Sequence, residues 1–86
     1  MNPEQIQTLI KLTNFREHAD NAFFSPADTL DLMQAMVLDY KDLAEYRDLL
    51  YERGAFRNDE LMAEFNKAET QIQLYKLILA ELPKYL

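Results

Sequence analysis

The chain has 86 residues, with nine basic and fifteen acidic side chains, a net charge of −6 and no cysteine. This length predicts one domain, residues 1–86, and the lack of cysteine excludes disulfides and thiolate metal sites. Apolar residues make up 49% of the chain, which favours a folded core over disorder. The negative charge argues against nucleic acid and anionic membranes as partners, because phosphate contacts need clustered Lys and Arg.

The first twelve residues are not those of a targeting segment. They include Glu4 and several polar side chains instead of a basic stretch followed by an apolar one, so no signal peptide is expected. No apolar run approaches the roughly 18 residues that span a bilayer. We therefore expect a cytoplasmic protein.

Helix-breaking residues divide the chain into three segments. The only prolines and the only glycine are Pro3, Pro26, Gly54 and Pro83. Each stands where a helix is expected to begin or end, and no strand pattern competes. The sequence therefore predicts an all-α fold, a three-helix bundle built on a long antiparallel helical hairpin. The expected helices cover residues of about 3–17, 26–53 and 59–82.

The first helix is expected to begin with Asn2 as its N-cap and Pro3 in its first turn. One narrow apolar stripe follows at helical spacing: Ile6, Leu9, Ile10 and Thr13. A helix with one such stripe is expected to lie against the other two and not between them.

The second helix is expected to start at a Ser25 cap followed by Pro26, with Phe24 packing on Leu30 or a close neighbour as a hydrophobic staple. It ends where Gly54 is expected to take the left-handed conformation. Its length of roughly 27 residues corresponds to about 40 Å.

The third helix is expected to begin after an Asn58 cap and to stop before Pro83. Its core stripe has near-heptad spacing: Leu61, Phe65, Ala68, Ile72, Tyr75 and Leu79. The short connection from Gly54 to Asn58 predicts that the second and third helices are antiparallel neighbours.

The second helix also has a ladder of carboxylates: Asp39, Asp42, Glu45 and Asp48. Three-residue steps place most of them opposite the apolar face. The ladder is either a solvated face or an electrostatic surface for a basic partner. In the second case it could mimic nucleic-acid phosphate, as a phage-type inhibitor would.

Three apolar residues lie on this acidic side of the second helix. Leu38 and Leu49 are eleven residues apart and share one azimuth, and Tyr46 lies close to it. Two interpretations remain open. The first helix covers these side chains, or they form an apolar island beside Asp42 and Glu45 that binds another protein.

Arg47 falls within the apolar face of the second helix. A guanidinium there needs a partner or must leave the core along its stem. Pairing with Glu69 or another carboxylate of the third helix, or stacking on tyrosine rings, predicts a structural role in the polar core. A ligand-anchoring arginine is the alternative.

The end of the third helix is apolar on more than one side. Leu74, Leu77 and Ile78 lie away from the stripe that faces the second helix. Either the first helix covers them or they form an interface, for example in a homodimer.

No arrangement of residues predicts catalysis, a metal or a cofactor. The single histidine, His18, has no nucleophile or second ligand in register and is expected at the surface. We therefore expect a small regulatory or adaptor protein that binds another protein with a basic or apolar surface.

Overall fold

The chain is all-α. The computed structural model describes residues 1–20 and 25–86, and in these ranges it contains three α-helices and no strand. The α-helices are α1 (Pro3–Lys11), α2 (Pro26–Glu52) and α3 (Asp59–Glu81). Three short 3-10 helices join or follow them: η1 (Arg16–His18), η2 (Ala55–Arg57) and η3 (Leu82–Tyr85).

Three polar side chains cap the α-helices at the positions that the sequence predicts. Asn2 Oδ1 accepts a hydrogen bond from the Gln5 amide at 2.8 Å. Ser25 Oγ accepts from the Asp28 amide at 3.1 Å, and Asn58 Oδ1 accepts from the Leu61 amide at 3.1 Å. Each bond satisfies an amide that has no partner within its own helix.

The first helix is shorter than predicted, because it ends at Lys11 and not near residue 17. The buried side chain of Thr13 explains this end. Its Oγ1 donates to the Ile10 carbonyl at 2.7 Å and accepts from the Phe15 amide at 3.1 Å. These bonds replace the next helical turn, as threonine side chains often do near backbone groups.

The two long helices end within one residue of the predicted positions. Gly54, just beyond α2, has a φ of 87°, which favours glycine. Pro83 does not end the helical conformation of the chain outright. Leu82 keeps right-handed helical angles (φ −55°, ψ −39°), and the chain tightens into η3. Leu82 is fully buried, and we attribute its helical backbone to that packing.

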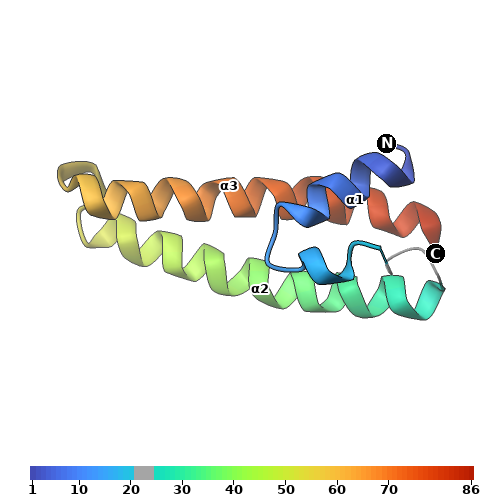
Figure 1. Cartoon of the computed structure of the whole chain (residues 1–86). Coiled ribbons are helices and arrows are strands. Elements are labelled where there is room, and N and C mark those ends of the chain that lie inside the picture. Colours follow the sequence, from blue (N-terminus) through green and yellow to red (C-terminus); the bar gives the residue numbers. More distant parts are fainter. Residues whose placement is uncertain (21–24) are drawn as a thin grey trace.

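Helices α2 and α3 lie side by side and run in opposite directions, whereas α1 covers only the part of this pair near the C-terminus (Figure 1). The molecule is consequently elongated, with extents of 45 × 19 × 19 Å. The part near η2 has only two helices.

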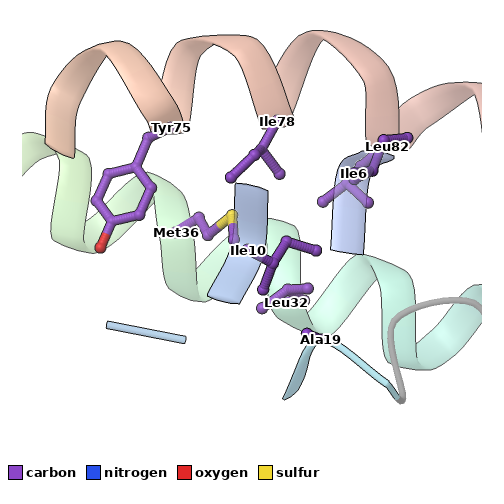
Figure 2. Packing of buried hydrophobic residues seen from close by; sticks show 8 residues of the cluster. All are labelled: Ile6, Ile10, Ala19, Leu32, Met36, Tyr75, Ile78 and Leu82. Atoms are coloured by element: carbon purple, nitrogen blue, oxygen red, sulfur yellow. The ribbon is translucent and has the colours of Figure 1, made fainter. Parts of the chain in front are cut away.

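The main core lies at the three-helix end. Figure 2 shows α1 contributing Ile6 and Ile10 to a cluster formed with side chains from both long helices. The other members of the cluster are Ala19, Leu32, Met36, Tyr75, Ile78 and Leu82. Along the rest of the pair, the buried apolar side chains are Leu50, Ala55, Ala68 and Ile72. The predicted packing of Phe24 on Leu30 lies outside the described residues.

Replacing Ile72 with alanine is expected to lower the free energy of unfolding by about 2–5 kcal/mol, because Ile72 is fully buried between α2 and α3. Leu38→Ala is the control, since Leu38 is 67% exposed and its loss is expected to cost less than about 0.5 kcal/mol. Urea unfolding followed by circular dichroism measures both. Equal losses of unfolding free energy in the two variants would contradict the burial of Ile72 in the contact between α2 and α3.

Candidate protein-binding surface

One side of α2 presents apolar side chains to solvent. Leu38 is 67% exposed, and Tyr46 and Leu49 are each 41% exposed. Leu38 and Leu49 are eleven residues apart, close to three full turns, and so point in the same direction. Helix α1 therefore does not cover these three residues. We call the surface formed by Leu38, Asp42, Glu45, Tyr46 and Leu49 the acidic face.

The four carboxylates of the predicted ladder do not act as one group. Asp39 accepts hydrogen bonds from the Tyr75 hydroxyl and from Asn14 Nδ2, so it faces inward. Asp48 Oδ1 lies 3.3 Å from Arg47 Nε. Asp42 and Glu45 are exposed and form no ion pair within residues 1–20 and 25–86. These last two are the members of the ladder without such a partner, whereas the Asp48 side chain is 70% exposed but paired with Arg47.

The acidic face begins where α1 ends. The Leu12 carbonyl, just after α1, accepts a hydrogen bond from Gln71 Nε2 at 3.0 Å. Beyond this point no third helix lies on the α2–α3 pair in Figure 1. There the Tyr46 hydroxyl donates to Glu64 Oε2 at 3.4 Å, which adds an α3 carboxylate to the rim of the same surface.

Arg47 pairs with Glu69, one of the α3 carboxylates that the sequence offers as its partner. Its Nη1 donates to Glu69 Oε1 at 2.7 Å, across the seam between α2 and α3. The hydrogen bond from Arg47 to Glu69 raises the pKa of the guanidinium, so its charge is retained. Its side chain is 27% exposed, which is consistent with a stem that lies along the seam and a head near water.

The three apolar residues predicted near the end of α3 occupy different environments. Ile78 is fully buried in the cluster that contains Ile6 and Ile10 of α1, so it is not available to a partner. Leu74 is half-buried, whereas Leu77 is 49% exposed. Helix α1 thus covers one side of α3, and these residues do not form a single exposed patch.

His18 is exposed at the end of η1, and its ring lies 6.4 Å from that of Phe15. The described part of the chain contains no group of three His, Cys, Asp or Glu residues arranged to hold a metal ion. Within the same residues, no helix is both long enough and apolar enough to cross a membrane.

The sequence pattern was not interpreted as placing Asp39 toward the core. The signal was present, because Asp39 follows Leu32 and Met36 at the three- and four-residue steps of the buried stripe. Its bonds join α2 to Tyr75 of α3 and to Asn14, which follows α1. Asp39 therefore links α2 to α3 and to the turn that follows α1.

Comparison with protein-family models, with curated proteins and with solved structures finds no match to this chain. The case for its function therefore rests on the surface described above.

The bond between Tyr75 and Asp39 predicts a loss of stability in alkali. Burial, and then the hydrogen bond to Asp39, raises the pKa of Tyr75 above its ordinary value of about 10. The folded state therefore holds the phenolic proton more tightly than the unfolded state. This contribution to stability is fully present below about pH 10 and is lost as the pH rises above that value.

Tyr75→Phe should lower the free energy of unfolding at neutral pH by about 1–3 kcal/mol and should flatten its fall above pH ~10. Urea unfolding at several pH values measures both effects. Tyr46→Phe, which alters an exposed hydroxyl, should keep the wild-type pH dependence. An unchanged alkaline slope in Tyr75→Phe would contradict the coupling.

Proposed function

We propose that this protein is a three-helix bundle on an antiparallel hairpin that acts as a small non-catalytic regulatory or adaptor protein. Its acidic face binds another protein whose surface combines apolar and basic side chains. The observation that carries the proposal is the exposure of Leu38, Tyr46 and Leu49 beside the exposed carboxylates of Asp42 and Glu45.

The apolar residues supply the main reason to expect binding. Each large side chain that a partner removes from water contributes about 1.5–3 kcal/mol when fully buried. Tyrosine at the centre of such a surface suits an interface, because its ring is apolar and its hydroxyl can remain hydrogen-bonded. Leu38 and Leu49 flank Tyr46 in sequence and form a strip along the helix.

The carboxylates supply selectivity. Asp42 and Glu45 lie between Leu38 and Leu49 in sequence, and Glu64 joins them across the seam through Tyr46. A basic partner would be attracted to this surface and an acidic one repelled, and both effects weaken with added salt.

Mimicry of nucleic acid has less support than binding of a mixed apolar and basic surface. A mimic needs a regular array of free carboxylates, but Asp39 is bonded within the fold and Asp48 lies against Arg47. The apolar side chains of Leu38 and Leu49 also interrupt the array.

A designed peptide provides a direct test. A helical peptide of about 14 residues, with leucines along one side and lysines flanking them, carries the partner chemistry that we propose. Leu49→Ser is expected to weaken its binding about tenfold or more, measured by fluorescence anisotropy. Val37→Ser is the control. Because Val37 is exposed on another side of α2, this change should leave the affinity for the peptide unchanged.

Charge is tested separately. Asp42→Asn combined with Glu45→Gln should weaken binding and reduce its dependence on salt. Glu4→Gln combined with Glu17→Gln removes the same charge elsewhere and should leave the salt dependence nearly unchanged. Equal binding by the wild type, Leu49→Ser and the Asp42/Glu45 variant would refute the proposal. So would equal binding of a peptide of the same composition in permuted order.

A further inference from the structure

A third helix lies on the α2–α3 pair at one end only. Helix α1 follows the pair as far as Gln71, whose Nε2 donates to the Leu12 carbonyl at 3.0 Å. The turn after α1 reaches Asp39, which accepts a hydrogen bond from Asn14 Nδ2 at 3.3 Å. From this level toward η2, none of the described residues forms a third helix on the pair (Figure 1). The side of the pair that α1 covers is therefore uncovered along the rest of its length.

The residues that line this uncovered part follow from those at which α1 ends. On α2, alternating steps of three and four residues lead from Asp39 to one row, and on α3 similar steps lead back from Gln71 to another. All members of both rows are exposed: Asp42, Tyr46, Leu49 and Arg53 on α2, and Lys67, Glu64 and Glu60 on α3. We call these seven residues the uncovered rows. The α2 row shares Asp42, Tyr46 and Leu49 with the acidic face.

A hydrogen bond joins the two rows. The Tyr46 hydroxyl on α2 donates to Glu64 Oε2 on α3 at 3.4 Å. The rows therefore lie on one side of the pair, and a ligand that packs on the Tyr46 ring reaches both long helices. The α2 row, from Asp42 to Arg53, covers about 18 Å, which corresponds to a helix of about 12 residues.

The uncovered rows are apolar in the middle and charged around it. Tyr46 and Leu49 are the apolar members, and three carboxylates and two cations surround them. Within residues 1–20 and 25–86, none of these five charged groups forms an ion pair. The carboxylates attract basic side chains, whereas Lys67, the one cation of the α3 row, opposes them.

Building on the function proposed above, we propose that the partner is an amphipathic helix that continues the line of α1 along the uncovered rows. It then completes a three-helix bundle over the rest of the pair. Helix α1 is the example within the chain, because its narrow apolar stripe buries Ile6 and Ile10 against the same two helices. The partner's apolar stripe covers Tyr46 and Leu49, and its basic residues meet the three carboxylates beside them.

Lys67 has a specific role in this arrangement. It belongs to the same row as Glu64, three residues closer to Gln71 and hence to the end of α1. A lysine of the partner that lies opposite Lys67 is repelled, whereas a carboxylate there gains an ion pair. Lys67 therefore selects among basic helices and favours one whose basic flank is interrupted by an acidic residue at this level.

The position of a bound helix is measured with the leucine and lysine peptide described above. The chain has no cysteine, so a nitroxide label can be attached at a single engineered position. Leu12→Cys places the label at the end of α1, and Arg57→Cys places it in η2, at the opposite end of the uncovered rows. In NMR spectra of the peptide, the first label should broaden the signals of one peptide end and the second label those of the other. Lys84→Cys, in η3, is the control and should broaden neither end.

The contribution of α3 is measured by charge reversal. Lys67→Glu should tighten binding of the same peptide about threefold, because it replaces a repelled cation with a carboxylate. Lys41→Glu changes the net charge equally, but Lys41 points about 140° away from Tyr46 around α2. It should alter the dissociation constant less than about 1.5-fold at ~0.15 M salt, where distant charges are screened. Fluorescence anisotropy gives the affinities, and circular dichroism establishes that both variants keep their helix content.

Failure of this placement differs from failure of the proposed function. A peptide that binds and responds to Leu49→Ser, but whose signals broaden at the same end with both labels or at neither end, would overturn the placement and leave the proposed function standing. Equal affinity of the wild type and Lys67→Glu would overturn the placement as well. No binding of the peptide to the wild type would refute the proposed function and this inference with it.

Discussion

The difference in length between α1 and the two long helices determines the character of this protein. Helix α1 has nine residues, whereas α2 has 27 and α3 has 23. At about 1.5 Å per residue, α1 covers about 14 Å of a pair that is about 40 Å long. The third helix that completes a core is therefore present at one end only, and apolar side chains remain exposed elsewhere on α2.

The junction between the two parts of the molecule is held by polar contacts. Asp39 accepts hydrogen bonds from Tyr75 and Asn14 close to the point where α1 ends. Gln71 bonds the Leu12 carbonyl at the same end of α1. Such contacts contribute less net free energy than apolar packing, but they are lost if the helices shift in register, because the partly buried Asp39 carboxylate would then lose its partners. We infer that Asp39 helps to hold the turn after α1 in place on the pair, whereas Thr13 ends the helix itself.

Signals that act within a few residues predicted the helices well. Contacts between residues that lie far apart in the sequence were harder to predict. The caps and Gly54 act within a few residues, so the starts of α1, α2 and α3 and the turn after α2 follow from them. A carboxylate partner for Arg47 on α3 was also predicted, with Glu69 as one candidate, because a guanidinium in an apolar stripe needs a counter-charge. The end of α1 depends on which way one hydroxyl, that of Thr13, points. The role of Asp39 depends on Tyr75, 36 residues away. Helical spacing places Asp39 on the buried stripe, but it shows neither its partner Tyr75 nor the direction of the Thr13 hydroxyl.

The shortness of α1 also bears on the binding function that we propose. Near the start of α1 the Met1 amine pairs with Glu81 at the end of α3, and just after α1 the Leu12 carbonyl accepts from Gln71, so α1 runs along the pair from the level of Glu81 to that of Gln71. A longer α1 would continue toward Tyr46 and Glu64, which lie beyond this level. Because α1 ends first, Tyr46 keeps its exposure, and the acidic face stays accessible to the partner that we propose.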